Sequence, residues 1–198
     1  MARTPNSRKE DTHDRILEVA ARALRREGYA GTGVAAVMKE AGLTHGGFYA
    51  HFGSRDALLV EALERAGAES GAVVRRAVEE GATRGVSPFR AMVNTYLSDE
   101  QLGSLESGCP VAALGCDMPR QSRPVRKAAA KGVQQLIDAV RATLPSASEA
   151  TATVITGTLV GSLQMARTLG DTPAGRAMLA GVRSSLIRQY DPSLKSGY

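Results

Sequence analysis

Residues 41–59 read AGLTHGGFYAHFGSRDALL, and the interpretation of the whole chain starts from this stretch. Gly42 favours a sharp turn, because glycine adopts positive φ at little cost. Thr44, two residues later, is a good N-cap for a short helix. Phe48 and Phe52 lie four residues apart and form one apolar face, while the polar residues between them project elsewhere. This pattern predicts the second, exposed helix of a helix-turn-helix.

Two adjacent glycines, Gly46 and Gly47, lie inside this predicted helix. Each weakens a helix by roughly 1 kcal/mol relative to alanine. We therefore expect them where a large partner approaches the backbone closely. Ser54 and Asp56 then suit the N-cap and the acidic first turn of a following helix.

The stretch resembles the DNA-binding signature of the TetR/AcrR family of repressors. The resemblance is carried by Thr44, Gly46, Gly47, Phe48, Tyr49, Ala50, His51, Phe52 and residues 54–58. It departs from the family pattern at Gly47, where threonine is common, and at Arg55-Asp56, which replace Lys-Glu. Upstream residues fit as well: Ile16, Leu17, Ala20, Leu24, Gly28, Tyr29, Thr32, Val34, Val37, Ala41 and Gly42. The strong resemblance covers residues 12 to 60.

The resemblance implies an all-α fold with three parts. Residues 1–10 would form a flexible arm, 11–56 a three-helix helix-turn-helix DNA-binding domain, and 57–198 a helical domain for ligand binding and dimerisation. A small-molecule effector would tilt the helix that links the two domains. The implied partners are double-stranded operator DNA, the effector and a second copy of the chain, with no cofactor, no metal and no membrane.

Phosphate and base contacts fall on different residues in this interpretation. The resemblance assigns phosphate contacts to Thr32, Tyr49, His51 and Arg55. Thr44 and His45 are the candidates for base edges, and Gly46 and Gly47 permit close approach. A dimer would read a two-fold-related operator with half-sites near multiples of about 34 Å.

Charge is consistent with an anionic partner. The net charge is +5, and residues 1–55 hold nine Lys or Arg against six Asp or Glu. The excess is densest where a DNA contact needs it, although a generally basic protein remains an alternative. The polar N-terminus lacks a signal-peptide core, and no apolar run approaches the roughly 18 residues of a membrane span, so we expect a cytoplasmic protein.

Hydrophobic periodicity predicts helices along the whole chain, at about 11–27, 33–41, 56–80, 88–97, 125–144, 149–169 and 174–190, with an irregular segment at 99–108. We assign a dimer interface to the last two helices through Ile155, Leu159, Leu163, Met178, Val182 and Leu186. Packing within one chain is the alternative for these residues. Gly157 and Gly161 permit close helix approach, and the polar residues around them argue against a membrane helix.

A possible ligand pocket is assigned to Met92, Tyr96, Cys116 and Met118. Cys109 precedes Pro110 at a predicted helix start, where backbone amides would raise thiol reactivity, so it is a candidate thiol sensor. The Gly-Cys-Pro context also resembles a family branch that includes electrophile sensors. The alternative is that both cysteines are small core residues.

Two other function classes compete with a ligand-responsive regulator. A small cysteine-dependent enzyme would need a clustered nucleophile and base, and the three histidines lie far from both cysteines in sequence. A non-specific DNA-packaging protein would have no operator preference and little use for the large apolar body.

Overall fold

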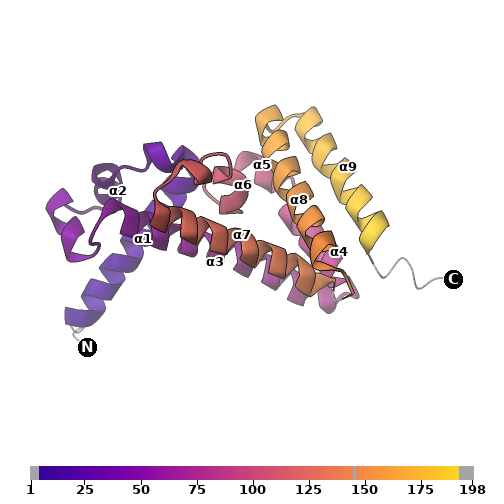
Figure 1. The fold of residues 1–198 in the computed structure, drawn as a ribbon, viewed down its shortest axis with the longest axis horizontal. Coiled ribbons are helices and arrows are strands. Elements are labelled where there is room, and N and C mark those ends of the chain that lie inside the picture. The colour runs from indigo at the N-terminus through magenta and orange to yellow at the C-terminus, as the bar shows by residue number, and fades with distance from the viewer. Residues whose placement is uncertain (1–4, 145, 192–198) are drawn as a thin grey trace.

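The computed structural model describes residues 5–144 and 146–191. Helices are the only regular secondary structure in these two ranges, in agreement with the all-α prediction. Their order is α1 (Pro5–Gly31), α2 (Val34–Glu40), η1 (His45–Ala50), α3 (Arg55–Ala82), α4 (Pro88–Tyr96), α5 (Glu100–Gly103), α6 (Pro110–Leu114), η2 (Met118–Arg120), α7 (Arg123–Thr143), α8 (Glu149–Leu169) and α9 (Pro173–Tyr190). Figure 1 shows α1, α2 and the segment between α2 and α3 at one end and α8 and α9 at the other, with α3 and α7 side by side between them.

Helix α1 begins earlier than the sequence pattern indicates. It starts at Pro5, so residues 5–10 are helical rather than part of a flexible arm; residues 1–4 of that predicted arm lie outside the described residues. Proline is tolerated in the first turn because its missing N–H has no intrahelical partner there. The polar residues that follow it gave no apolar periodicity by which to place the helix start.

Two glycines shape the N-terminal end of the structure. Gly28 has φ of 71° and interrupts α1, so that Tyr29 folds back and is buried. Gly42 has φ of 70° and turns the chain between α2 and η1. Both positions confirm the predicted turns, because this left-handed region strains residues that carry a Cβ atom.

Side-chain caps begin α3 and α4, and the cap of α3 is the predicted one. The Ser54 hydroxyl accepts the Ala57 N–H at 3.1 Å at the start of α3, with Asp56 in its first turn. The Ser87 hydroxyl accepts the Arg90 N–H at 3.2 Å, and Pro88 occupies the first turn of α4. Each cap satisfies a backbone donor that the helix itself leaves unpaired.

The segment expected to be irregular between α4 and α6 contains one helical turn, α5. Cys109 precedes Pro110 as the N-cap of α6, as predicted. Helix α6 ends at Leu114, however, so Cys116 does not continue on the same helix. Pro119 lies within the next short helix, η2.

The core runs continuously from α1 to α9. Ile155, Leu159, Leu163 and Leu186 are buried in this core within a single chain. Their assignment to a dimer interface is therefore wrong, because intrachain neighbours already cover them. Met178 and Val182 are half-buried against the same core. In the described ranges, no helix has the length and apolarity that crossing a membrane requires.

Candidate nucleic-acid interface and effector cavity

The short helix η1 is anchored from below by aromatic rings. Phe48 and Phe52 are buried, and their rings stack with centroids 5.6 Å apart. His13 of α1 stacks on Phe52 at 4.5 Å, and its Nε2 lies 2.8 Å from a carboxylate oxygen of Glu61 in α3. The prediction that both phenylalanines belong to the core is confirmed. Together these contacts fix η1 against α1 and α3.

The opposite side of η1 is open to solvent. Thr44, His45 and Gly46 are exposed, and the Tyr49 side chain is 71% exposed with its ring edge against Phe48. The outward face therefore presents hydroxyl and imidazole groups together, on a segment that is packed firmly underneath.

The two glycines of η1 are not required by the fold. Neither has positive φ, and a Cβ atom at Gly46 would meet nothing within 4 Å. A Cβ atom at Gly47 would make only ordinary contacts, 3.7 Å from the Met38 methyl carbon and 3.8 Å from the Thr44 hydroxyl. Glycine weakens a helix relative to alanine. Because residues with a Cβ atom would also fit at both positions, no contact within the chain explains why glycine is present there.

Thr32 and Arg55 make contacts that the sequence did not indicate. Thr32 is buried, and its hydroxyl donates to the Gly28 carbonyl at 2.7 Å, so it cannot reach a phosphate as expected. The N-cap of α2 is the next residue, Gly33. The Arg55 guanidinium donates to the carbonyls of Tyr29 and Thr32. It fastens the start of α3 to the end of α1.

His51 lies at the edge of the exposed face. Its ring is half-buried, 6.0 Å from the His13 ring, and its Nδ1 is buried with no hydrogen-bond partner in the described part of the chain. Burial, followed by electrostatic contributions from His13 and Lys9, lowers the pKa of His51. Its ring is therefore neutral at pH 7, and a phosphate contact from it would be a neutral hydrogen bond.

A cavity of about 140 Å³ lies between α3, α4 and the chain around Cys109. Its walls are formed by Ser70, Val73, Val74, Thr95, Tyr96, Gln101, Ser107, Gly108, Cys109 and Leu163. Tyr96 is buried, and its hydroxyl has no hydrogen-bond partner among the described residues. Burial and the neighbouring Cys109 thiol raise the pKa of Tyr96 well above its ordinary value, so the hydroxyl stays protonated and available as a donor.

The structure separates the residues that were assigned to one ligand pocket. Tyr96 lines the cavity, together with Cys109. Met92 is packed in the core, with its sulfur 3.9 Å from the Thr143 hydroxyl. Cys116 is exposed, and Met118 lines a separate shallow apolar groove between α6 and α7. Grouping Met92, Cys116 and Met118 with Tyr96 was wrong, because helix periodicity does not reveal which buried faces meet.

Sequence reasoning also missed three contributors. His13 supports η1, and two arginines near the end of α1, Arg25 and Arg26, reach the loop before Cys109. Their signal was weak, since a polar residue on a helix of mixed polarity ordinarily faces solvent. No group of three or more potential metal-ligating side chains gathers among the described residues.

Comparison with known proteins identifies the N-terminal unit. Residues 16–62 match the description "Bacterial regulatory proteins, tetR family". The HTH-type transcriptional regulator LmrA of Bacillus subtilis is 28% identical over 122 residues, which are 60% of this chain and 63% of that protein. The aligned part thus spans less than two thirds of this curated relative.

Solved structures are similar over nearly the whole chain. A TetR transcriptional regulator from Chloroflexus aurantiacus superposes with a TM-score of 0.71 at 18% identity, covering 92% of this chain and 96% of the other. A TetR-family regulator from Agrobacterium tumefaciens gives 0.73 at 19% identity, covering 92% and 98%. Escherichia coli NemR in its reduced form gives 0.69 at 24% identity, covering 88% and 96%. At these identities the likeness establishes a shared fold. The family match shows in addition that residues 16–62 are similar to the N-terminal unit of TetR-family regulators.

Proposed function

We propose that this chain is a homodimeric repressor that binds specific double-stranded DNA and is released by a small molecule. The observation that carries the proposal is the exposed polar face of η1, with Thr44, His45 and Tyr49 outward over the buried Phe48 and Phe52. A rigid helix with its polar face outward fits the major groove, where base edges present hydrogen-bonding groups.

Thr44 and His45 are the residues proposed to read base edges, with Gly46 and Gly47 allowing the backbone to approach. Tyr49 and His51 are proposed to bind phosphates as neutral partners. Arg55 already binds two carbonyls, and we assign it the positioning of α3 against α1. This division places sequence preference and general affinity on different residues.

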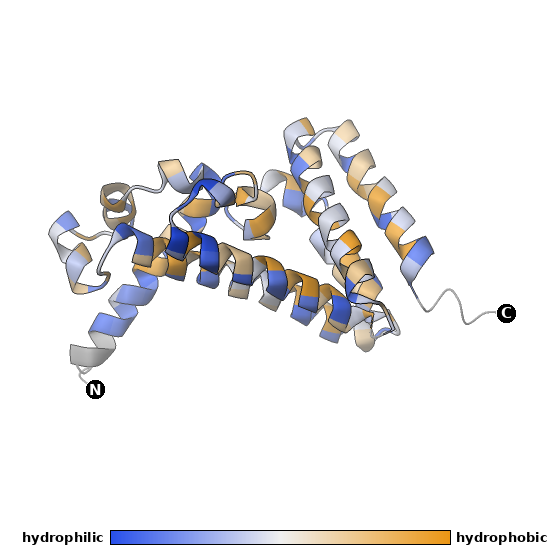
Figure 2. Ribbon diagram, in the orientation of Figure 1, coloured by the Kyte–Doolittle hydropathy of each residue, from blue (hydrophilic) through white to orange (hydrophobic). Residues whose placement is uncertain are grey.

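Dimerisation is proposed through the outward face of α8. Val154, Gly157, Gly161 and Met165 recur at helical spacing, and Val154 and Met165 are 61% and 54% exposed. A Cβ atom at either glycine would meet nothing within 4 Å, so another helix has room to approach closely. Hydrophobic and neutral residues predominate along α8, whereas the start of α7 is strongly hydrophilic (Figure 2). A two-fold pairing of α8 would cover these residues.

The effector is proposed to occupy the cavity beside Tyr96 and Cys109. The unpaired Tyr96 hydroxyl would donate to an acceptor atom of the ligand. Cys109 lines the same cavity, so a thiol-reactive compound that enters it would add to the sulfur and enlarge the occupied volume. Release from DNA would follow if occupancy favours a conformation in which the two η1 helices no longer fit their half-sites.

The test begins with selection of bound sequences from a random pool of duplex DNA, followed by affinity measurements on the selected and scrambled duplexes. Tyr49→Phe is expected to weaken both by a similar factor, whereas His45→Ala reduces the preference for the selected duplex. A chain that enriches no sequence is not a specific repressor. Equal losses on both duplexes for both variants would refute the proposed division of contacts.

The thiol part is tested in a Cys116→Ser chain, which leaves Cys109 as the remaining cysteine. Alkylation with N-ethylmaleimide, verified by mass, is expected to lower operator affinity, and a Cys109→Ser, Cys116→Ser chain is the unreactive control. Complete alkylation with unchanged affinity, or no alkylation at all, would remove Cys109 as a sensor while leaving the DNA-binding proposal intact.

A further inference from the structure

The loop between α5 and α6, residues 104–108, faces two parts of the molecule. On one side Ser107 and Gly108 form part of the cavity wall beside Cys109. On the other side Glu106 meets α1, the first helix of the DNA-binding unit. One short segment therefore touches both the proposed effector site and the DNA-binding end.

Arg25 of α1 makes the buried part of this connection. Its side chain is 3% exposed, and its guanidinium donates to the Glu106 carbonyl at 2.7 Å and to the Glu69 carboxylate in α3. Burial lowers the pKa of Arg25, and Glu69 opposes that effect. Because a buried guanidinium is costly without partners, displacement of the Glu106 carbonyl would be felt directly at Arg25.

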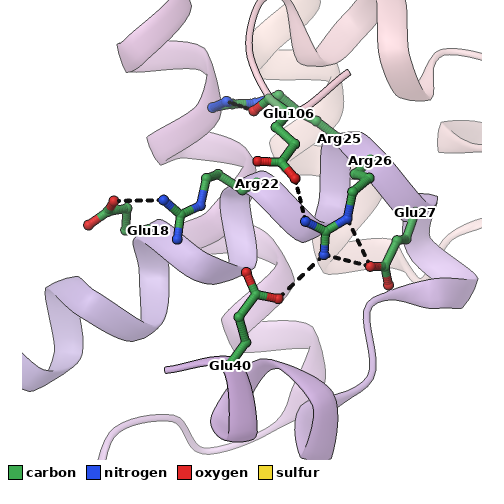
Figure 3. A network of polar contacts seen from close by, with 7 residues as sticks. All are labelled: Glu18, Arg22, Arg25, Arg26, Glu27, Glu40 and Glu106. Atoms are coloured by element: carbon green, nitrogen blue, oxygen red, sulfur yellow. Dashed lines mark hydrogen bonds and ion pairs between the residues drawn. The ribbon is translucent and has the colours of Figure 1, made fainter. Parts of the chain in front are cut away.

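Arg26 makes the exposed part (Figure 3). Its guanidinium bonds the Glu106 carboxylate at 2.5 Å and the Glu40 carboxylate of α2 at 3.3 Å, in addition to the adjacent Glu27. Exposed ion pairs of this kind stabilise little individually. These ion pairs matter here because of their position, since the Arg26 guanidinium connects the 104–108 loop to both α1 and α2.

Arg167 of α8 holds the loop from the other side. Its guanidinium donates to the Gln101 carbonyl at 2.9 Å and to the Ser104 carbonyl at 3.3 Å. The loop is therefore held between α8 and the α1–α2 pair, because arginine side chains from α8 and α1 donate hydrogen bonds to its backbone carbonyls. A shift of the loop has to change contacts at one end or the other.

We propose that the 104–108 loop transmits occupancy of the Tyr96–Cys109 cavity to the DNA-binding unit through Arg25, with Arg26 as a secondary link. Arg25 and Arg26 are thus positioning residues for η1, and neither needs to touch DNA or effector. The inference rests on the proposed function, because it assigns a route to the regulation proposed there.

Gly108 offers a way to displace the loop without any effector. Its φ is 84°, and a Cβ atom there would lie 2.2 Å from the Gln101 side-chain oxygen and 3.3 Å from a guanidinium nitrogen of Arg167. A β-branched residue is strongly disfavoured at such φ, so Gly108→Val strains the loop. Gly85→Val is the matched control, because Gly85 also has positive φ, 72°, but faces open space in the turn between α3 and α4.

The experiment is a double-mutant cycle on affinity for the selected duplex. Gly108→Val is measured alone and combined with Arg25→Met, which keeps an apolar stem in place and leaves Glu69 paired with Arg65 at 2.9 Å. Arg22→Met is the control on the same helix, because the partner of Arg22 is Glu18 of α1 itself (Figure 3). Melting curves establish that each variant is folded at the assay temperature, and Arg25→Gln, which also removes the guanidinium, replaces Arg25→Met if the latter is not.

Gly108→Val is expected to lower operator affinity about fivefold or more, within the usual range of coupling between sites. In the Arg25→Met chain the same change is expected to cost less than about twofold, and in the Arg22→Met chain the full loss remains. An equal loss in the Arg25→Met chain, or no loss from Gly108→Val in the parent chain, overturns the route. A parent chain without any sequence preference instead overturns the proposed function.

Discussion

The two ends of the molecule hide their apolar residues in different ways. At the DNA-binding end, Phe48 and Phe52 point inward while polar groups point outward, so one face of η1 is apolar and the other is not. At the far end, α8 buries Leu159 and its neighbours but also exposes Val154 and Met165. The polarity of the side chains therefore distinguishes the buried face of η1 from its exposed face. On α8 both the buried face and the exposed face carry apolar residues, so polarity does not distinguish them.

This difference explains how far the sequence could predict the site. The glycine turns, the aromatic anchor and the cap of α3 depend on local rules, and they were predicted correctly. Four of the six predicted interface residues are buried within the chain instead, because an i, i+4 pattern specifies a shared face but not what covers it. Met92, Cys116 and Met118 were grouped with Tyr96 for the same reason, since long-range packing decides which residues line the cavity. The phosphate contact predicted for Thr32 was wrong for a different reason, because the Thr32 hydroxyl donates to the Gly28 carbonyl instead.

The largest expected effect tests the aromatic anchor. Phe52→Ala should destabilise the chain by about 3–5 kcal/mol, because it removes a ring buried against Phe48 and His13. Denaturant unfolding measures the loss. Tyr49→Ala is the matched control, since its exposed ring should change stability little while DNA affinity falls. Similar losses of stability for both variants would show that the two aromatic faces are not different.

The next effect tests the outward face of α8. Met165→Arg should weaken the dimer about 30-fold or more, because it places a charge in an interface core. Sedimentation at graded protein concentrations measures the change. Gln135→Arg on the exposed side of α7 adds the same charge elsewhere and should leave assembly unchanged. A dimer that persists in Met165→Arg would move the interface to another face.

The smallest effect tests the glycines of η1. Gly46→Ala should stabilise the free chain by roughly 0.5–1 kcal/mol, because the added Cβ atom meets nothing. Operator affinity should fall at the same time, since the backbone could no longer approach the bases as closely. Gly132→Ala in α7 also adds a Cβ atom in open space, and it should stabilise the chain without changing DNA affinity. Unchanged affinity for Gly46→Ala would mean that Gly46 does not lie against DNA.

Helix α3 is part of both ends of the molecule, and its length makes it a lever. Its 28 residues, at about 1.5 Å each, give a rod of roughly 42 Å. Pivoting such a rod by about 5° at one end sweeps the other sideways by about 4 Å, more than the length of a hydrogen bond. A small displacement of α3 at the cavity would thus become a larger displacement at its N-terminal end, next to η1. There it would be large enough to misalign η1 with the major groove of DNA.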